Sequence, residues 1–389
     1  MNYYSERIQT LPPYIFSQFQ QRKKELEAKG MDIIDLGIGA PDLPTPTFII
    51  DELVKETYLT QNHRYSPYQG CAEFREAVAN FYQKHYGVIL DPDHDVLTLI
   101  GSKEGIANFI TATINPSEIV LVPNPGYPVY QSAIHLAGGI TAHIPLLEEE
   151  NFKPNFQQLS HEQLDQAKLM LLNYPSNPTA GTVEKEVFEE AVHLAKEHEF
   201  IIAQDAAYDL MTFGDYEAPS LLQVPGAKDV AVEFGSLSKS FNMTGWRIGY
   251  AVGNRDLLKA LSIVKSNTDT SQFLPIQKAA AVALNSDLSS VKANNLIYEE
   301  RLEKTLKALD TLGIKVNRPR GTFYVWAKVP SNFDSMSFAS AMLEQAGVII
   351  TPGTAFGQAG EGYFRISLSV PNEKLEEAIE RMKALEGVL

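Results

Sequence analysis

The sequence contains a single cysteine, Cys71, among 389 residues, so a disulfide within the chain is excluded. So few cysteines are typical of proteins in a reducing cytoplasm. For Cys71 we favour a small side chain packed in a helical segment over a nucleophile, because free cysteines are mostly buried. No apolar run reaches the roughly 18 residues that cross a bilayer. Because the polar start MNYYSERIQT also lacks a signal-peptide pattern, we expect a soluble, cytoplasmic protein.

Metal-ligand and dinucleotide motifs are lacking as well. The eight histidines show no H-E-x-x-H or comparable spacing, so no metal site is expected. No G-x-G-x-x-G opens a helix after the first predicted strand, which disfavours a dinucleotide. Positive charge is scarce, since Lys and Arg number 33 against 48 Asp and Glu, for a net charge of -15. This argues against nucleic acid or an anionic membrane as a partner, whereas a local cationic cluster could still bind a small anionic substrate.

Short apolar runs alternate with helical patterns through most of the chain. The runs are 119–122 (IVLV), 169–172 (LMLL), 200–203 (FIIA) and 230–234 (VAVEF). Runs of this length suit strands buried on both faces. Residues 184–198, after Thr182, place apolar side chains on one helical stripe. The alternation predicts an α/β fold with a mostly parallel sheet flanked by helices.

The pattern changes after about Gln277. We predict a long amphipathic helix over 294–312, a strand at 323–327, a helix at 338–345, short strands near 348–350 and 364–368, and a final helix from Glu373. These elements indicate a smaller α+β domain. The predicted organisation is an N-terminal arm (1–44) that joins the small domain, a large domain (45–280) and a small C-terminal domain (281–389).

The segment 235–249, GSLSKSFNMTGWRIG, is the strongest candidate for chemistry. It follows an apolar strand, and loops beyond the carboxyl ends of parallel strands commonly bind ligands. Lys239 is accompanied by Ser236 and Ser238 and followed by Arg247. This suits an imine between Lys239 and a phosphorylated aldehyde whose phosphate the Ser and Arg side chains hold. A lysine alone would more often be an exposed loop residue, so the prediction rests on the whole string.

Asp205 in AQDAAY follows the predicted strand 200–203. A carboxylate buried there is costly unless it meets a cation. A protonated pyridine nitrogen would provide that cation, and the protonated ring would act as an electron sink. Tyr208 could then donate a hydrogen bond to the phenolic oxygen of the ring. The alternatives are a helix N-cap for Asp205 and simple packing for Tyr208.

Three further loops carry candidate cofactor contacts. In NYPSNPTAG, at 173–181, the Asn-Pro turn points the amide of Asn177 into the cleft, although the prolines also suit a turn alone. GSKEG, at 101–105, lies between an apolar run and a helical pattern, and N–H groups at such a helix start attract phosphate. Tyr127 in NPGYPVY could stack on a cofactor ring or simply pack.

Arg365 in GYFRISLS alternates with apolar residues on a late predicted strand. A half-buried Arg usually has an anionic partner, and its fork fits a carboxylate in bidentate fashion. The partner is either a substrate carboxylate or an internal acidic residue.

Together these segments resemble the class I/II aminotransferases, the fold-type I pyridoxal-phosphate enzymes, from about Asp35 to the C-terminus. The match is ordered: G-x-G-x-P-D at 37–42, Tyr65, GSKEG, the Tyr127 loop, N-P at Asn177, D-x-x-Y at Asp205, S-x-S-K and R-x-G within 236–249, and Arg365. Any one element is weak evidence, whereas their common order is highly specific. The segments RIQTLPPYIF and DLGIGAPDLPTP are similar to the branch that includes the LL-diaminopimelate aminotransferases.

The resemblance implies pyridoxal 5'-phosphate as cofactor and a role for each matched residue. Lys239 carries the cofactor and moves a proton from Cα to C4′, Asp205 pairs with the pyridine nitrogen, Tyr208 and Asn177 contact the phenolic oxygen, and Tyr127 stacks on the ring. The phosphate is held by Ser102, Lys103, Glu104 (through backbone groups), Ser236, Ser238, Arg247 and, from the other subunit, Tyr65. Arg365 binds the substrate α-carboxylate with Asn177 and the backbone of Gly39, and Tyr14 reaches towards the substrate side chain.

The resemblance further implies an obligate homodimer with shared active sites. The implied reaction is a ping-pong transamination between an L-amino acid and a 2-oxo acid, for which we expect 2-oxoglutarate. A carbon–sulfur β-lyase on the same fold is one alternative. A non-catalytic effector-binding domain is another, although the chain begins too close to the fold and is too acidic for a helix-turn-helix module. Two departures from the family pattern are the N-P-T-A-G sequence, with Ala180 in place of the usual N-P-T-G, and Ala206 where an acidic residue is usual.

Overall fold

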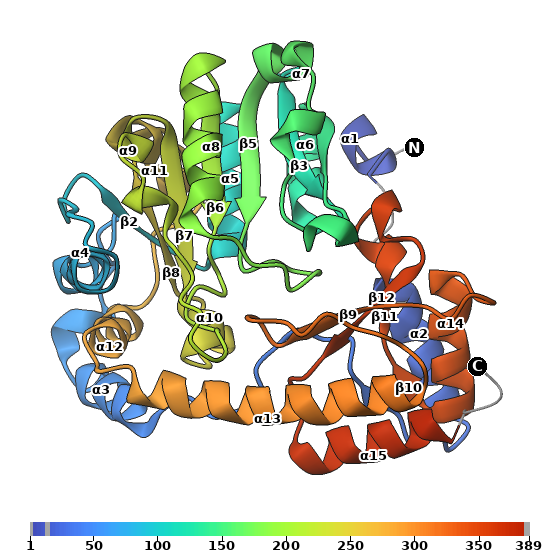
Figure 1. Ribbon diagram of the computed structural model, residues 1–389. Coiled ribbons are helices and arrows are strands. Elements are labelled where there is room, and N and C mark those ends of the chain that lie inside the picture. Colours follow the sequence, from blue (N-terminus) through green and yellow to red (C-terminus); the bar gives the residue numbers. More distant parts are fainter. Residues whose placement is uncertain (1–2, 12–15, 385–389) are drawn as a thin grey trace.

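A seven-stranded sheet forms the centre of the molecule. The computed structural model describes residues 3–11 and 16–384 (Figure 1). The strand order is β2-β8-β7-β6-β5-β3-β4, with β2 (Val96–Leu99), β3 (Ile119–Asn124), β4 (Ile140–Pro145), β5 (Ala167–Asn173), β6 (Ile201–Asp205), β7 (Ala231–Ser236) and β8 (Gly249–Gly253). β8 pairs antiparallel with β2 and β7, and the other neighbours pair in parallel. The predicted α/β class with a mostly parallel sheet is confirmed.

Helices cover both faces of this sheet because successive strand side chains point to opposite sides. In β5, Leu169 and Leu171 pack with one group of helices, and Met170 and Leu172 pack with the other. The first group is α5 (Ser102–Thr113), α6 (Val129–Ala137) and α11 (Arg255–Ser266); the second is α4 (Ala72–Tyr86), α8 (Lys185–Glu197) and α12 (Leu274–Leu284). The strands are therefore buried on both faces, as their apolar sequences predicted.

The strands of the sheet extend further than their apolar runs. β5, β6 and β7 continue to Asn173, Asp205 and Ser236, and the ladder pairs Asn173 with Asp205 and Asp205 with Phe234. The backbone hydrogen bonds of these strands continue through polar residues that interrupt the apolar pattern. The strands predicted from apolar residues alone therefore ended too early. As a result, polar side chains stand together at the carboxyl edge of the sheet, where ligands bind in such folds.

A second hydrophobic cluster lies beside the sheet layer and contains the predicted α+β elements. It is built on a three-stranded sheet in the order β11-β12-β9 and a parallel pair, β1-β10. The bounds are β1 (Ile34–Asp35), β9 (Tyr324–Lys328), β10 (Val348–Ile349), β11 (Thr351–Pro352), β12 (Tyr363–Ser367), α13 (Ser289–Thr311), α14 (Ser335–Ala341) and α15 (Asn372–Lys383). Pairing of Ile34 with Val348 joins an early segment to the last third of the chain. The domain limits at 44/45 and 280/281 stay a prediction.

Helix α13 begins before the predicted residue 294 and links the two parts of the molecule. Its Val291 packs in a cluster with the sheet helices, whereas Leu302 and Leu309 pack in the second cluster. Figure 1 shows α13 running along the base of the molecule from α12 to α15. The sheet layer and the second cluster thus share one long helix.

The remaining helices are short or peripheral. They are α1 (Glu6–Gln9), α2 (Phe16–Glu27), α3 (Thr47–Thr57), α7 (His161–Gln166), α9 (Ala227–Val230) and α10 (Leu237–Ser240). In the described part of the chain, no helix combines the length and the apolar character needed to span a membrane. Cys71 is the buried N-cap residue of α4, and burial raises its pKa to about 11. This agrees with a packing role rather than a nucleophile.

Candidate active site

A cavity of about 470 Å³ opens at the carboxyl ends of β5, β6 and β7. Asn173, Asp205 and Ser236, the last residues of these strands, line it. Most of the predicted site residues line it too: Gly39, Ser102, Lys103, Tyr127, Asn177, Asp205, Tyr208, Ser236, Ser238, Lys239, Arg247 and Arg365. Residues separated by more than 300 positions in the sequence, such as Gly39 and Arg365, therefore share one wall.

Lys239 lies on the one-turn helix α10 that follows β7. The Ser236 hydroxyl caps this helix by accepting a hydrogen bond from the backbone N–H of Ser238 at 3.2 Å. The Lys239 ammonium donates to the carbonyl oxygen of Gly39 at 2.6 Å. Burial, with repulsion from Arg365 and Arg247, lowers the pKa of Lys239 to about 8. The amine therefore loses its proton, and becomes nucleophilic, much more readily than an exposed lysine does.

Asp205 is buried at the end of β6 with one carboxylate oxygen unpartnered. Its Oδ2 accepts a hydrogen bond from the Tyr130 hydroxyl at 2.8 Å, whereas Oδ1 has no donor among the described residues. Burial raises the pKa of Asp205 to about 6. The alternative of a helix N-cap is wrong, because the next helical element after Asp205 begins at Leu221. An unpartnered buried acceptor of this kind calls for a donor from the cavity.

Arg365 is a buried cation with neutral acceptors. Nη1 donates to Asn177 Oδ1 at 2.6 Å and Nη2 to the Gly37 carbonyl at 2.7 Å, while Nε has no acceptor. In the described ranges no Asp or Glu forms an ion pair with Arg365, so the alternative of an internal acidic partner finds no support there. A buried guanidinium without a counter-ion, in a cavity wall, suits an incoming carboxylate.

The start of α5 and Arg247 form an anion-binding corner. Gly101 precedes the helix with φ +111°, and a Cβ there would lie 2.3 Å from Arg247 Nη2, so the close approach requires glycine. Arg247 donates to the carbonyls of Thr244 at 3.0 Å and Ile100 at 3.3 Å. The guanidinium thus adds its charge to the free N–H groups of a helix N-terminus, an arrangement that binds phosphate.

Two of the predicted residues that the structure describes do not line the cavity. The Glu104 side chain accepts a hydrogen bond from Asn108 on α5, and burial, with repulsion from Asp269, raises its pKa to about 7. Tyr65 is 89% exposed. A residue that contacts the active site of another subunit is expected to be exposed when one subunit is viewed alone. Tyr14 lies outside the described residues. The roles of all three stay predictions.

Comparisons with known proteins point to a family whose chemistry suits this cavity. A model of the family aminotransferase class I and II matches residues 31–382. The chain belongs to aminotransferase class I and II. Members of this class depend on pyridoxal phosphate, and the protein is therefore a pyridoxal-phosphate-dependent transaminase. The family also confirms the resemblance on which the sequence interpretation rested.

Several relatives align over nearly the whole chain. LL-diaminopimelate aminotransferase from Moorella thermoacetica is 46% identical, over 98% of this chain and 98% of that protein. The enzyme of the same name from Aquifex aeolicus is 47% identical, over 98% and 99%. The solved apo structure of BacF from Bacillus subtilis has a TM-score of 0.96 at 38% identity, covering 99% of both chains. A Thermus thermophilus aspartate aminotransferase variant has a TM-score of 0.92 at 30% identity, covering 99% of this chain and 100% of that one.

The residues of the aminotransferase cavity fit pyridoxal phosphate. Asp205 Oδ1 is a buried acceptor without a donor, and a protonated ring nitrogen is such a donor. The corner at Gly101 and Arg247 offers charge and free N–H groups to a phosphate. The Lys239 amine lies in the same cavity.

Two residues that contact the predicted site residues were missed by the sequence interpretation. Tyr130 donates to Asp205, and the only sequence signal was a second tyrosine in NPGYPVY. Tyr324 lies within hydrogen-bond distance of Tyr208 and lines the cavity. Its partners are distant in sequence, so no local motif marks it.

The two departures from the family pattern leave the cavity contacts in place. Ala180 has φ +55°, a left-handed conformation that glycine adopts without strain. The loop is nevertheless closed by hydrogen bonds of Ala180 and Gly181 with Ser176, at 3.0 and 2.9 Å, and Asn177 still accepts from Arg365. Ala206 is buried, and its N–H donates to Phe234.

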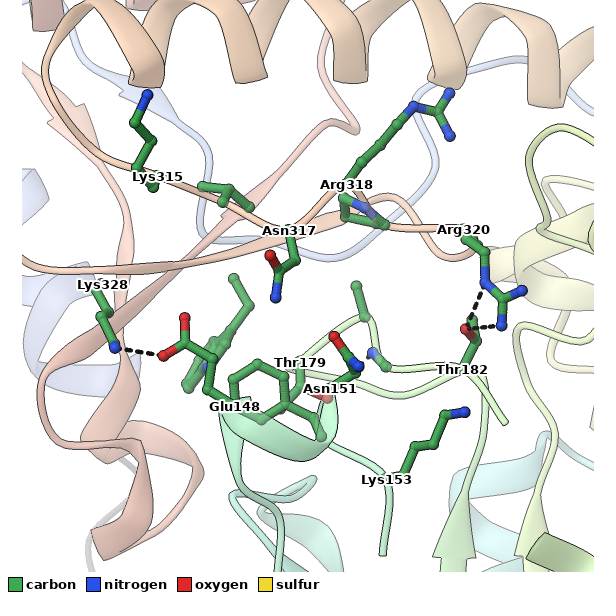
Figure 2. A pocket seen from close by; sticks show the side chains of 16 residues that line it. Glu148, Asn151, Lys153, Thr179, Thr182, Lys315, Asn317, Arg318, Arg320 and Lys328 are labelled. Atoms are coloured by element: carbon green, nitrogen blue, oxygen red, sulfur yellow. Dashed lines mark hydrogen bonds and ion pairs between the residues drawn. The ribbon is translucent and has the colours of Figure 1, made fainter. Parts of the chain in front are cut away.

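A second cavity, of about 310 Å³, is lined by residues 179–182 that follow Asn177 (Figure 2). Its lining contains the basic residues Lys153, Lys315, Arg318, Arg320 and Lys328. Four of these are already paired, Lys315 with Asp310, Arg318 with Glu299 and Glu303, Arg320 with Glu184, and Lys328 with Glu148. Figure 2 shows Arg320 beside Thr182 and Lys328 beside Glu148. Because its cations are largely neutralised, this cavity is a poor anion site compared with the one at Lys239.

Proposed function

We propose that this aminotransferase transfers an amino group from LL-diaminopimelate to 2-oxoglutarate by a ping-pong mechanism. The substrate is supported by relatives of that name at 46% and 47% identity. The reaction class is supported best by one geometric observation, that the Lys239 amine shares a cavity with Asp205, whose buried Oδ1 lacks a donor. A nucleophilic amine and a free buried carboxylate are the two groups that pyridoxal phosphate chemistry requires.

In this proposal each part of the cofactor has its own set of residues. Asp205 faces the ring nitrogen, Tyr208 and Asn177 face the phenolic oxygen, and Tyr127 covers the ring. The phosphate lies at the start of α5, held by Ser102, Lys103, Ser236, Ser238 and Arg247, with the backbone of Glu104 and the partner subunit's Tyr65. All of these except Glu104 and Tyr65 line the same cavity, which supports the assignment.

The residues of the chain divide the work of the reaction. When bound, pyridoxal phosphate supplies an aldehyde carbon for the amino group and a protonated ring that withdraws electrons from Cα. Lys239 Nζ removes the proton from Cα and delivers it to C4′, and its pKa of about 8 suits both roles. Arg365 holds the α-carboxylate and so fixes Cα relative to Lys239. The amino group would stay on the cofactor when water frees the 2-oxo acid, and the same residues would serve the second substrate in the reverse direction.

We further propose a homodimer that completes the active site. The exposed large apolar residues of the described chain include Ile38, Tyr58, Tyr65, Tyr68, Ile263 and Phe273. Ile38 also lines the cavity, and the rings of His63 and Phe273 lie 5.4 Å apart, which brings the segment of Tyr65 beside α12. An exposed apolar surface that continues into a cavity is typical of a subunit interface.

Amino-donor assays with 2-oxoglutarate test the substrate. LL-diaminopimelate, aspartate, alanine, methionine and aromatic amino acids are compared by glutamate formation, with Lys239→Ala as control. We expect the highest kcat/KM with LL-diaminopimelate, and loss of both turnover and the visible absorbance band of the lysine imine in Lys239→Ala. Another donor that is at least about tenfold better would refute the substrate but not the reaction class. Pyruvate from cystathionine without glutamate would instead indicate the β-lyase.

A further inference from the structure

Tyr324 connects the two halves of the active site. We propose that Tyr324 is a positioning residue that joins the carboxylate site at Arg365 to the cofactor site at Tyr208. The inference rests on the roles proposed above for Arg365 and Tyr208, but not on the identity of the amino donor. Tyr324 is the first residue of β9, is 2% exposed and lines the cavity.

The hydroxyl of Tyr324 lies 2.9 Å from the hydroxyl of Tyr208. A tyrosine hydroxyl has one proton to donate and can accept further hydrogen bonds. If Tyr324 donates to Tyr208, the proton of Tyr208 stays available for a partner in the cavity. The position of Tyr324 thus directs the single proton of Tyr208 towards the cofactor's phenolic oxygen. Burial raises the pKa of Tyr208 well above its usual range, so this proton is retained.

The ring of Tyr324 supports the guanidinium of Arg365. The Arg365 Cζ atom lies 4.1 Å from the ring centroid, an attractive cation–π distance. The strand register explains this contact, because β12 pairs Arg365 with Trp326 and Ser367 with Tyr324, which makes Arg365 and Tyr324 diagonal neighbours. One side chain therefore contacts the carboxylate-binding residue with its ring and Tyr208 with its hydroxyl.

The backbone holds Tyr324 in place from two sides. A Cβ at Gly39 would lie 1.9 Å from the Tyr324 hydroxyl oxygen, so the chain at Gly39 packs directly against that hydroxyl. On the other side, the Tyr324 N–H donates to the hydroxyl of Thr322 at 3.1 Å. Thr322 is fully buried with φ +65°, a strained conformation for a β-branched residue. Strain at this point is consistent with a side chain that must be held in one orientation.

Two substitutions separate the hydroxyl from the ring. Tyr324→Phe keeps the ring and removes one hydrogen bond. It should lower kcat about 3–10-fold, the effect of losing one hydrogen bond, and change KM less than about twofold. The apparent pKa of the bound cofactor's visible absorbance should rise by about half a unit to one unit, because Tyr208 then stabilises the phenolic oxygen less well. Tyr324→Leu should add a rise of about threefold to tenfold in amino-acid KM, since Arg365 then keeps only the ring of Phe356, 4.7 Å from its Cζ atom.

A double substitution and a matched control complete the test. Tyr208→Phe should shift the absorbance pKa at least as far as Tyr324→Phe, and the combined variant should shift it no further than Tyr208→Phe alone. Tyr363→Phe, which removes a β12 hydroxyl that contacts Glu148 outside the cavity, should leave all three measurements unchanged. A Tyr324→Phe titration that coincides with the unmodified enzyme, or additive shifts in the double variant, would overturn the inference. The absorbance titration needs no substrate, so a wrong amino donor would leave this result unaffected.

Discussion

At the scale of single residues, the ionisation of Asp205 depends on burial and on the groups around its carboxylate. Burial raises the pKa of Asp205 to about 6, and the hydrogen bond from Tyr130 counteracts that rise. In the proposed mechanism the carboxylate must be ionised to pair with the ring nitrogen. A carboxyl group with a raised pKa loses its charge as the pH falls through that pKa, so the hydrogen bond from Tyr130 extends cofactor binding to lower pH.

Tyr130→Phe should therefore move the acid limb of cofactor binding to the apoenzyme towards higher pH. A hydrogen bond to a charged group contributes about 1.5–3 kcal/mol, which corresponds to a shift of about one to two pH units. The measurement is the pH dependence of pyridoxal phosphate affinity, followed by absorbance. Tyr216→Phe, which loses a hydroxyl bonded to the Val183 carbonyl, is the control. An unchanged acid limb in Tyr130→Phe would contradict the role of this hydroxyl.

The sequence could predict the residues that local segments mark. Lys239, Asp205 and Arg365 each occur in a distinctive string after or within a predicted strand, and the structure places all three in one cavity. Tyr130 and Tyr324 have no such signal, because their hydrogen-bond partners lie 75 and 116 residues away. Contacts of that range depend on how strands align in the folded sheet, which a single sequence does not reveal.

At the scale of elements, the G-x-G-x-P-D segment is fastened to α13 by a buried ion pair. Asp42 accepts two hydrogen bonds from Arg301, at 2.7 and 2.9 Å. The Arg301 side chain is 4% exposed and also donates to Asn372 and to the Leu368 carbonyl. This anchor holds the chain just beyond Gly39, whose carbonyl contacts Lys239.

Asp42→Ala should leave the Arg301 guanidinium buried without its counter-ion. We expect the free energy of unfolding to fall by about 3–5 kcal/mol, measured by urea denaturation. Asp310→Ala is a suitable control, because the pair of Asp310 with Lys315 is exposed at 62% and 84%, and such pairs contribute about 1 kcal/mol or less. Equal effects of the two substitutions would show that the buried pair is not an anchor.

Element boundaries were harder to predict than element types. The sequence predicted a helix over 338–345, whereas α14 covers Ser335–Ala341 and a π-helical turn, Met342–Ala346, follows it. The earlier start is set by a capping box in which the Asp334 side chain accepts from the Ser337 N–H at 2.7 Å. Apolar periodicity does not detect such a cap, because both of its residues are polar.

At the scale of the whole molecule, the proposed dimer predicts complementation between two inactive variants. Lys239→Ala removes the amine of its own site, and Tyr65→Ala removes the hydroxyl that its partner's site needs. When the two are dissociated, mixed and reassociated, half of the dimers should be mixed and contain one intact site, which restores about a quarter of normal activity. Activity of the mixture that merely averages the two variants would contradict shared active sites.

The placement of α13 has a consequence for how the molecule loses its structure. The helix contributes Val291 to one cluster and Leu309 to the other, so disrupting either cluster uncovers apolar surface on the same element. Calorimetry should accordingly record one cooperative melting transition instead of two. For the same reason, a truncation that ends before this helix would leave the sheet layer with an open hydrophobic face and a tendency to aggregate.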